Sequence, residues 1–392
     1  MIWGELEDKL AALDQEQQLR RRRIVDSPCG TRLTVDGPSD THELLAFCSN
    51  DYLGLANDPQ IVAALCAGAQ RWGAGSGAAH AVSGHLRPHQ QLEEALAQFV
   101  GLPRALLFST GFMANLGIVP ALVGRGDAVF ADRLNHASLI DAALASGAEH
   151  KRYAHKDIEA LDKLLKLSSA KRKLILTDSV FSMDGDIAPL DKLYALAETH
   201  DAWLVIDDAH GFGVLGTHGC GSLSHFNLLA SPRIIYMGTL GKAAGVAGAF
   251  VAGDATVIEW LQQRSRTAIF TTAHPPAVSC ALLKSLELIA AGAARRKHLH
   301  ALIAQLRQEL APLALQHGWQ LTDSQMPIQP LIVGSNRNAL ELSAVLEAQG
   351  IWVPAIRPPT VPQGSARLRI CLSAAHSEAD VAALITALEK CA

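Results

Sequence analysis

The fold is decided by one stretch in the second half of the chain, Arg233-Ile234-Ile235-Tyr236-Met237-Gly238-Thr239-Leu240-Gly241-Lys242. Residues 233–237 are a short apolar run of the kind found in a strand that is buried on both faces. The carboxyl ends of such parallel strands face the crevice in which these sheets bind ligands, so Lys242 is a candidate ligand-binding residue. A desolvated lysine can lose its proton and form a Schiff base with a carbonyl compound. On this stretch alone, a surface lysine in a turn is the alternative.

Further apolar runs precede this stretch and alternate with helical patterns. They have the length of buried strands and cover residues 105–108, 128–131, 174–176 and 203–206. One helical pattern between them runs from Leu92 to Phe99 and ends at Gly101, a residue type that is common just after a helix. This alternation predicts an α/β fold, in which a large cofactor-binding domain (46–285) has a mostly parallel sheet covered by helices.

Two smaller parts flank this large domain. Residues 1–45 are expected to form an N-terminal helical arm, because Leu6, Leu10 and Leu13 have the spacing of one helix face. The arm ends in a basic run, residues 20–23, which is typical of a solvated face or a partner for carboxylates. Residues 286–392 are expected to form a smaller C-terminal α+β domain, with strand candidates and a capping-box signature at 331–333, 367–372 and 377–380.

The composition excludes several classes of protein. The 392 residues contain 34 Lys and Arg against 38 Asp and Glu, a formal net charge of −4, which is not the basic surface that nucleic-acid binding requires. Hydrophobic residues make up 49% of the chain, which is too much for a disordered protein.

Cysteine, histidine and apolar patterns bear on metal, redox state and location. The 7 cysteines contain no CxxC pair and no histidine pair stands beside them at metal-ligand spacing, so we expect a reduced protein without a metal. The chain shows no signal peptide and no apolar stretch of about 20 residues. We therefore expect a cytoplasmic protein without membrane association.

Two glycine-rich stretches do not match nucleotide-binding motifs. Residues 73–77 lack the GxGxxG spacing and follow no buried strand. The second stretch, Gly241-Lys242, is followed by Ala243, where a P-loop has serine or threonine after its lysine. A nucleotide-dependent oxidoreductase on a doubly wound sheet is therefore disfavoured. A non-catalytic binding protein with the same fold stays open as an alternative.

Three strand ends together carry the groups that pyridoxal phosphate (PLP) needs. Asp207 follows the apolar run 203–206, and a buried carboxylate needs a partner such as a pyridinium N–H. Residues 109–112 begin a helix whose free N–H groups can bind a phosphate, and Thr239 can add a hydroxyl. PLP uses a lysine for its aldehyde carbon and a carboxylate for its ring nitrogen. Each group alone is compatible with an ordinary turn or cap, but the combination predicts this cofactor.

Five motifs carry a resemblance to a known family. They are Ser49-Asn50-Asp51-Tyr52-Leu53-Gly54, Asn135-His136-Ala137-Ser138, Val180-Phe181-Ser182-Met183-Asp184-Gly185-Asp186, Asp207-Asp208-Ala209-His210-Gly211 and Thr239-Leu240-Gly241-Lys242. From the N-terminal arm to His376, the sequence resembles the α-oxoamine synthases. These are PLP-dependent acyltransferases with the aspartate-aminotransferase fold, PLP fold type I. The resemblance implies a decarboxylating condensation of an amino acid with an acyl thioester.

The resemblance implies catalytic roles for four residues, namely Lys242, His136, Asp207 and His210. Lys242 would hold the cofactor aldehyde and then act as acid and base at the substrate α-carbon. Asp207 would pair with the ring nitrogen and His136 would stack on the ring. His210 and Ser182 would hydrogen-bond near the ring oxygen.

The resemblance also implies how the cofactor phosphate is held. The backbone of Gly111 and Phe112 would bind it together with the hydroxyl of Thr239. Thr271 and Thr272 resemble residues that reach the phosphate of the neighbouring subunit. The expected assembly is therefore a homodimer with shared active sites.

The remaining implied residues bind substrate. Arg369 is expected to hold the amino-acid carboxylate, a bidentate geometry that suits guanidinium. Arg20, Asn50 and Thr360 are expected to contact the acyl substrate, with His136 as a further substrate contact.

One stretch discriminates among the members of the family. Residues 355–362, Ala-Ile-Arg-Pro-Pro-Thr-Val-Pro, favour L-alanine and a pimeloyl thioester, either pimeloyl-CoA or pimeloyl-acyl-carrier protein. The alternative is a sibling synthase that joins glycine to a short acyl-CoA, of the 2-amino-3-ketobutyrate CoA ligase type. His85 stands where many of these synthases have a tyrosine.

Overall fold

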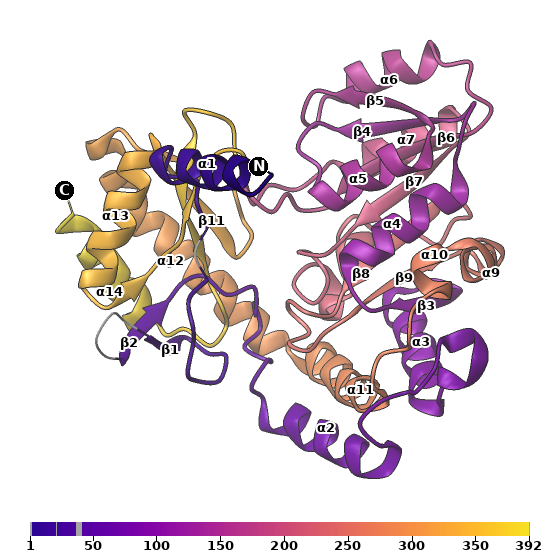
Figure 1. Ribbon diagram of the computed structural model, residues 1–392, viewed down its shortest axis with the longest axis horizontal. Coiled ribbons are helices and arrows are strands. Elements are labelled where there is room, and N and C mark those ends of the chain that lie inside the picture. Colours follow the sequence, from indigo (N-terminus) through magenta and orange to yellow (C-terminus); the bar gives the residue numbers. More distant parts are fainter. Residues whose placement is uncertain (1, 21, 37–40, 392) are drawn as a thin grey trace. The chain divides into compact units, whose positions relative to one another are not determined.

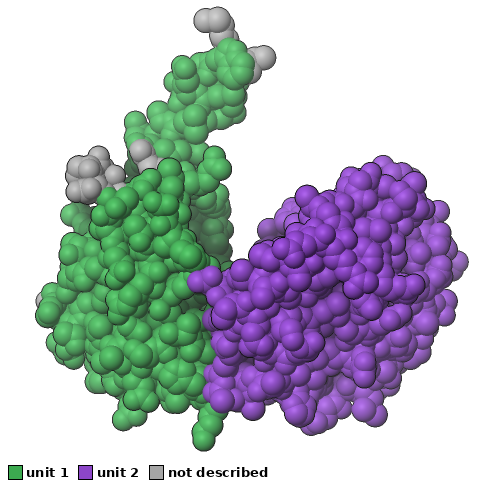
Figure 2. All heavy atoms as spheres, turned by 90° about the horizontal axis from the view of Figure 1, so that it is seen from below, with its two compact units in different colours: residues 1–52, 183–186, 297–392 green, residues 53–182, 187–296 purple. Residues whose placement is uncertain are grey.

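The computed structural model describes residues 2–20, 22–36 and 41–391, so Arg21 of the basic run lies outside the described residues (Figure 1). The chain divides into two compact units. Unit 1 comprises residues 1–52, 183–186 and 297–392, and unit 2 comprises residues 53–182 and 187–296 (Figure 2). This division groups the N-terminal segment with the C-terminal part of the chain, and its boundaries lie near 52 and 296 rather than at 45 and 285.

Unit 2 is built on a seven-stranded sheet. In spatial order its strands are β3 (Arg104–Phe108), β9 (Ala249–Gly253), β8 (Ile234–Thr239), β7 (Ala202–Asp207), β6 (Lys173–Asp178), β4 (Ala128–Asp132) and β5 (Glu149–Tyr153). The pairs β8–β7, β7–β6, β6–β4 and β4–β5 are parallel. The expected mostly parallel sheet is therefore confirmed, and the predicted runs 105–108, 128–131, 174–176, 203–206 and 233–237 match β3, β4, β6, β7 and β8.

Strand β9 is the exception to the parallel arrangement, because it runs antiparallel to both of its neighbours. It follows β8 after residues 240–248. A parallel return needs a crossover of roughly a dozen residues or more, so this short connection requires an antiparallel turn. The segment between β8 and β9 contains Lys242, which thus lies in a tight loop at the carboxyl end of β8.

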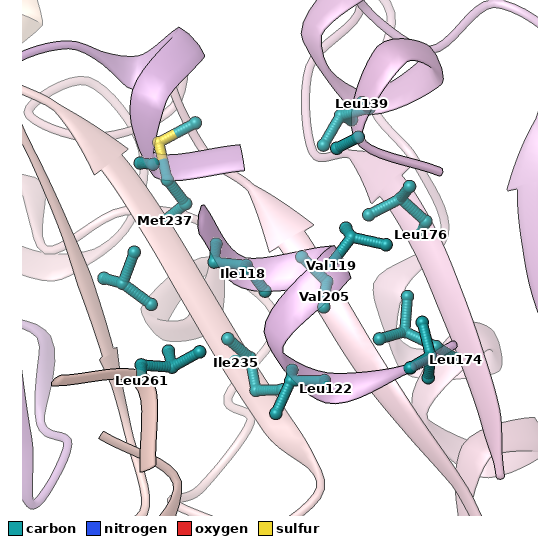
Figure 3. Packing of buried hydrophobic residues seen from close by; sticks show 14 of the residues in the cluster. Ile118, Val119, Leu122, Leu139, Leu174, Leu176, Val205, Ile235, Met237 and Leu261 are labelled. Atoms are coloured by element: carbon teal, nitrogen blue, oxygen red, sulfur yellow. The ribbon is translucent and has the colours of Figure 1, made fainter. Parts of the chain in front are cut away.

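The core of unit 2 lies where α4 (Gly111–Leu122) and α5 (Ala137–Ser146) pack on the sheet. Ile118, Val119 and Leu122 of α4 belong to the same buried cluster as Val205 of β7 and Ile235 of β8 (Figure 3). An almost entirely apolar helix such as α4 has to be buried. Its N-terminus is thereby fixed at the carboxyl ends of the strands.

The other helical segments of unit 2 complete its layers. They are α2 (Pro59–Trp72), η1 (His80–Gly84), α3 (Arg87–Val100), α6 (Ile158–Lys166), α7 (Leu190–Thr199), η2 (Thr217–Gly219), α8 (Ser222–His225), α9 (Ala255–Arg264), α10 (Arg266–Ile269) and α11 (Pro276–Ala291). The predicted helix end at Gly101 is confirmed, since this residue caps α3 with a φ of 72°.

Unit 1 contains two small sheets and four helices within the described residues. One sheet orders β1 (Arg32–Asp36), β2 (Thr41–Ala46) and β12 (Ile351–Trp352), and the other orders β10 (Gln320–Leu321), β11 (Ile328–Gly334), β14 (Ala366–Cys371) and β13 (Ala355–Ile356). The helices are α1 (Ile2–Gln15), α12 (Ala293–His317), whose first residues belong to unit 2, α13 (Asn336–Ala348) and α14 (Glu378–Glu389). Ser377 and Asp380 form the predicted capping box of α14.

Among the described residues, no helix is by itself long and apolar enough to cross a membrane, although α11 and α12 would meet that test together as a bent pair.

We expect Gly117→Ala to destabilise unit 2. A Cβ added at Gly117 would lie 2.2 Å from Ser265 Oγ and 2.8 Å from Phe108 Cε1, so α4 would have to shift away from β3 and α10. Overpacking of this kind costs about 1–3 kcal/mol, which urea unfolding would measure. Gly124→Ala is the control, because its Cβ would find no atom closer than 3.8 Å. Equal unfolding free energies for the two variants would contradict the packing argument.

A pH-dependent stability difference is expected for Glu93→Gln. Burial raises the pKa of Glu93 from 4.5 to about 7. The hydrogen bond from the N–H of Leu107 and the charge of Arg104 act in the opposite direction but are outweighed. The folded chain then binds more protons than the unfolded chain between these values, so this glutamate weakens the fold increasingly as pH rises from 4.5 to 7. Glutamine keeps the acceptor for Leu107, 2.9 Å away, and carries no charge. Relative to the parent, the variant should gain roughly 3 kcal/mol between pH 4.5 and 7 in urea unfolding; a constant difference would contradict this account.

Candidate active site

Lys242 and His210 meet at the carboxyl ends of two neighbouring strands. Lys242 follows β8 and His210 follows β7, and these strands are paired in parallel. Lys242 Nζ lies 2.8 Å from His210 Nε2. A protonated lysine can only donate, so in that state His210 Nε2 presents its lone pair. The imidazole is thus placed to receive a proton from the lysine.

Asp207 is the last residue of β7, and its carboxylate is only 3% exposed. Its Oδ2 accepts from Asn115 Nδ2 at 2.8 Å, and its Oδ1 accepts from the N–H of Ala209 at 3.0 Å. Asn115 lies on α4, and the same amide nitrogen donates to Ser138 Oγ at 2.9 Å. Donors from two different elements therefore hold the orientation of the carboxylate.

A second buried carboxylate stands beside Asp207. Asp178 ends β6 directly opposite Asp207 in the parallel register. Burial raises the pKa of Asp178, and the negative charge of Asp207 raises it further, while the N–H of His136 and the charge of Lys242 act against this. Both effects disfavour the charged form of Asp178 beside Asp207.

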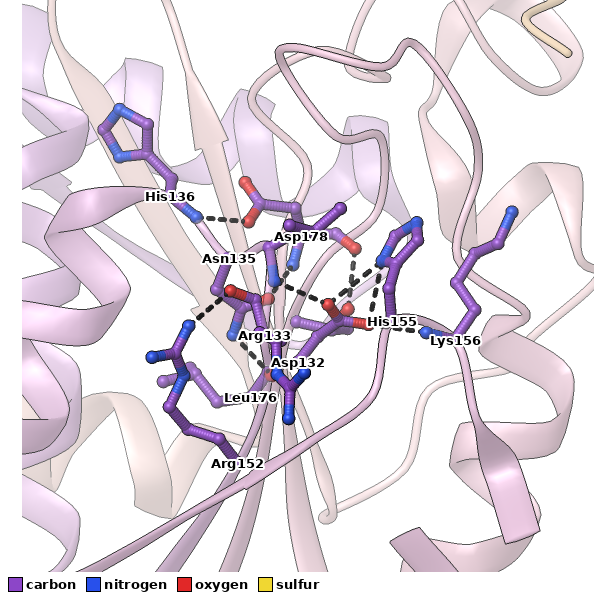
Figure 4. A network of polar contacts seen from close by, with 11 residues as sticks. Asp132, Arg133, Asn135, His136, Arg152, His155, Lys156, Leu176 and Asp178 are labelled. Carbon is purple, nitrogen blue, oxygen red and sulfur yellow. Dashed lines mark hydrogen bonds and ion pairs between the residues drawn. The ribbon is translucent and has the colours of Figure 1, made fainter. Parts of the chain in front are cut away.

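His136 is held at the start of α5 by its own backbone. Its N–H donates to Asp178 Oδ2 at 2.7 Å, and its imidazole points away from that bond (Figure 4). The preceding turn is tied to β6 through Asn135 Nδ2, which donates to the carbonyl of Leu176 at 2.7 Å. Burial lowers the pKa of the His136 ring. The charge of Asp207 acts to raise this pKa, and the charge of Lys242 lowers it further. A neutral, flat ring with a fixed backbone suits stacking on an aromatic ligand.

The N-terminus of α4 is the segment for which the sequence predicts an anion site. Thr110 Oγ1 accepts from the N–H of Met113 at 3.1 Å, and the N–H groups of Gly111 and Phe112 have no acceptor within the helix because they belong to its first turn. A Cβ added at Gly111 would lie 3.9 Å from Thr239 Oγ1. The end of β8 therefore brings a hydroxyl beside a helix N-terminus, a combination that favours phosphate.

These groups fit PLP by their chemistry. Unit 2 places a lysine, a buried carboxylate, a flat imidazole and a phosphate cradle at the carboxyl ends of β6, β7 and β8 and the start of α4. Ser182 lies in the turn after the bridge between Val180 and Ile187. Thr271 and Thr272 lie in the segment before α11, where Thr271 Oγ1 donates to the carbonyl of Thr272 at 3.5 Å. The roles given to these three residues, like those of the other predicted site residues, stay predictions.

Unit 1 holds the predicted substrate residues in two groups. In the first, Arg369 Nη1 and Nη2 lie 3.3 and 3.4 Å from Asn50 Oδ1, and Nη1 also lies 2.8 Å from Cys371 Sγ. Arg369 is 6% exposed, so these acceptors set the direction of a buried guanidinium. In the second group, Arg20 Nη2 donates to Thr360 Oγ1 at 3.4 Å.

Sequence reasoning missed several residues of these groups. Asn115 and Cys371 gave no sequence signal, because each is recognisable only by the partner that the fold brings to it. Asp178 could have been found, since it ends β6 as Asp207 ends β7. Arg357 lies close to Arg20, whose positive charge adds to burial in lowering the Arg357 pKa. Two guanidinium groups so placed attract an anion.

Comparison with known proteins defines the class first. Residues 42–388 match the family described as aminotransferase class I and II, and the chain therefore belongs to that family. Among solved structures, a serine palmitoyltransferase from Sphingomonas wittichii has a TM-score of 0.90 and 30% identity, covering 99% of this chain and 96% of its own. A serine palmitoyltransferase from S. paucimobilis with a bound PLP–myriocin aldimine has a TM-score of 0.90 and 28% identity, covering 98% and 96%.

Within that family, full-length relatives place the chain in one group. The 8-amino-7-oxononanoate synthase of Dechloromonas aromatica is 60% identical over 100% of both chains, and that of Herminiimonas arsenicoxydans is 59% identical over 99% of both. A solved 8-amino-7-oxononanoate synthase from Francisella tularensis has a TM-score of 0.76 and 31% identity, covering 89% of this chain and 98% of its own. The resemblance found in the sequence is confirmed at this level.

We expect Cys371→Ala to loosen Arg369 without unfolding unit 1. Sulfur accepts from Nη1 at 2.8 Å, and alanine removes that acceptor while keeping a small side chain on β14. If Arg369 binds the substrate carboxylate, KM for the amino acid should rise several-fold with little change in kcat. Cys371→Ser is the matched control, because its hydroxyl can accept in place of sulfur and should restore KM. Equal KM values for the alanine variant and the parent would remove Cys371 from this role.

Proposed function

We propose that this chain is a PLP-dependent 8-amino-7-oxononanoate synthase, acting in biotin biosynthesis. It condenses L-alanine with a pimeloyl thioester. A carbon–carbon bond forms between the alanine α-carbon and the thioester carbonyl, the thiol leaves, and the alanine carboxylate departs as CO₂. The observation that carries the proposal is the placement of Lys242, His210 and Asp207 on the ends of two adjacent strands. Full-length relatives with 60% and 59% identity support the particular reaction.

The cofactor supplies an electron sink that stabilises negative charge at the amino-acid α-carbon. Lys242 would hold its aldehyde carbon, Asp207 its ring nitrogen, and His136 one face of its ring. His210 and Ser182 would lie near its ring oxygen. The first turn of α4, at Gly111 and Phe112, would bind its phosphate together with Thr239.

Proton transfer at the α-carbon is the task of Lys242. Its Nζ would remove the α-proton of alanine and return a proton to the same carbon after CO₂ is lost. His210 Nε2, 2.8 Å away, can take a proton from the ammonium and so provide the neutral amine that this step requires. The protein's further contribution is to hold the reacting atoms in a fixed geometry.

A single buried negative charge at the strand ends is the electrostatic requirement of this site. Burial and the charge of Asp207 raise the pKa of Asp178, which disfavours two adjacent negative charges at these strand ends. Asn115 and the N–H of Ala209 aim the Asp207 carboxylate. This arrangement supports a protonated ring nitrogen on the cofactor.

Unit 1 supplies the substrate residues in this proposal. Arg369 would bind the alanine carboxylate, with Asn50 and Cys371 setting its direction. Arg20, Asn50 and Thr360 would contact the acyl substrate. Thr271 and Thr272 would reach the cofactor phosphate of the partner in a homodimer. The pimeloyl group would arrive as a thioester of either coenzyme A or acyl-carrier protein.

The proposal is tested by Lys242→Ala with product mass as the readout. Without the Nζ amine, formation of 8-amino-7-oxononanoate from alanine and pimeloyl-CoA should fall by more than about 100-fold. Lys166→Ala is the matched control, because that lysine is exposed on α6 and pairs with Asp162 in the same helix. Turnover at the parent rate by the Lys242 variant would contradict the role assigned to Lys242.

Substrate choice is decided by a matrix of alanine or glycine with pimeloyl-CoA or acetyl-CoA. We expect the alanine and pimeloyl pair to give the highest kcat/KM. Preference for glycine and acetyl-CoA would keep the family and move the chain to the sibling synthases.

A further inference from the structure

Four histidines gather in unit 2, next to the segment that carries Thr271 and Thr272. His80 and His85 flank the one-turn π-helix η1, His89 lies in the first turn of α3, and His274 precedes α11. The ring centroids of His80 lie 5.0 Å from His85 and 5.1 Å from His89, and those of His89 and His274 lie 4.8 Å apart. This group is called the histidine cluster below.

The π-helix explains why His80 and His85 meet. A π-helix bonds residue i to residue i+5, and these two histidines are five positions apart. A Cβ added at Gly84 would lie 1.9 Å from the carbonyl oxygen of Ala78, so this tight turn needs glycine. The backbone therefore fixes the pair of imidazoles against each other.

The hydrogen bonds determine which ring nitrogens are available. His80 Nδ1 lies 2.8 Å from His85 Nδ1, so at least one of the two atoms carries a lone pair. His85 Nε2 lies 3.2 Å from Gln90 Oε1, and the orientation of that amide is set because Gln90 Nε2 donates to Glu94 Oε1 at 2.7 Å. His85 Nε2 is therefore protonated, and in the neutral ring Nδ1 presents its lone pair toward His80.

His89 is occupied on both sides of its ring. Its Nδ1 accepts from the N–H of Leu86 at 2.9 Å and thereby caps α3. Its Nε2 then donates to the carbonyl of His274 at 2.9 Å. A nitrogen of His89 lies within 4.8 Å of those of His80 and His85. Because both ring nitrogens of His89 are already in hydrogen bonds, this residue packs against the pair and is not counted as a ligand.

We propose that His80 and His85 bind one divalent transition-metal ion, Zn²⁺ or Cu²⁺, through their Nδ1 atoms. Two imidazole nitrogens on a tetrahedral ion at about 2.0–2.1 Å stand about 3.3 Å apart, so a small outward movement from the observed 2.8 Å makes room for the ion. When the ion binds, the proton on His80 Nδ1 moves through solvent to Nε2 of the same ring, so both imidazoles stay neutral. Water completes the coordination.

The surroundings of the pair suit a cation that enters from solvent. His80 and His85 line a cavity of about 200 Å³ together with Gln90, Glu93 and Arg104. His85 is partly exposed, which gives an entry path. Glu93 contributes negative charge when it is ionised, and Arg104, whose charge opposes a cation, is paired with Glu259. The ring of His80 is already neutral, because burial lowers its pKa to about 4 with His89 and His85 adding to the effect.

The test is titration of the cofactor-loaded full chain with ZnCl₂ at pH 7.5 after chelator treatment, followed by calorimetry. We expect one ion per chain. In the double variant His80→Phe/His85→Phe, affinity should fall at least about tenfold. His225→Phe, an exposed histidine on α8, is the control and should bind as the parent does.

Two further measurements keep the proposal falsifiable if the double variant folds poorly. The single variant His85→Phe changes a partly exposed side chain and should lose the same site. Electron paramagnetic resonance of the Cu²⁺-loaded parent should show coupling to two imidazole nitrogens. Unchanged affinity in His85→Phe, no one-to-one binding by the parent, or a Cu²⁺ signal without nitrogen coupling would each overturn the proposal.

Discussion

Two carboxylates buried side by side at the ends of β6 and β7 are the constraint on which unit 2 depends. Asp178 and Asp207 stand opposite each other in the sheet and are 3% exposed each. Burying a carboxylate is expensive unless donors replace its water. The donors come from α5 through the N–H of His136 and from α4 through Asn115. The positions of both helices are therefore tied to the chemistry of the strand ends.

This constraint also places the phosphate cradle. Asn115 lies one turn into α4, so the contact with Asp207 brings the beginning of the helix to the same edge of the sheet. The apolar side chains of α4 then pack on β7 and β8 in the cluster around Val119, Val205 and Ile235. One helix thus serves the core with its length and the Asp207 carboxylate with its second turn, and its N-terminus is the phosphate site that we propose.

The catalytic part of this arrangement could be predicted from sequence because its signals are local. A buried strand followed by a chemically active residue is visible for Asp207 and Lys242 without knowledge of the fold, and parallel pairing brings such ends together. Strands β5 and β9 were not predicted. The sequence of β5, Glu-His-Lys-Arg-Tyr, has no apolar run because it is the edge of the sheet, and β9 is a short run of mostly small residues.

Residues recognised only by a distant partner could not be predicted. Asn115 lies 92 positions from Asp207. An asparagine in a helix gives no sequence signal that its side chain will bind a carboxylate at the end of a strand. Arg357 belongs to the discriminating stretch 355–362, but its nearness to Arg20 depends on how the N-terminal segment folds within unit 1. For such residues the physical information lies in the pairing and not in either residue alone.

The histidines show the same principle within a single residue type. His210, His89 and His85 are chemically identical, yet the neighbour on one ring nitrogen fixes the task of the other. An amide oxygen on Nε2 turns Nδ1 of His85 into a lone pair aimed at His80. A backbone N–H on Nδ1 makes His89 a helix cap and commits its Nε2–H to a carbonyl. Since one ring nitrogen determines the other, the function of a histidine follows from its second partner, which only the folded chain supplies.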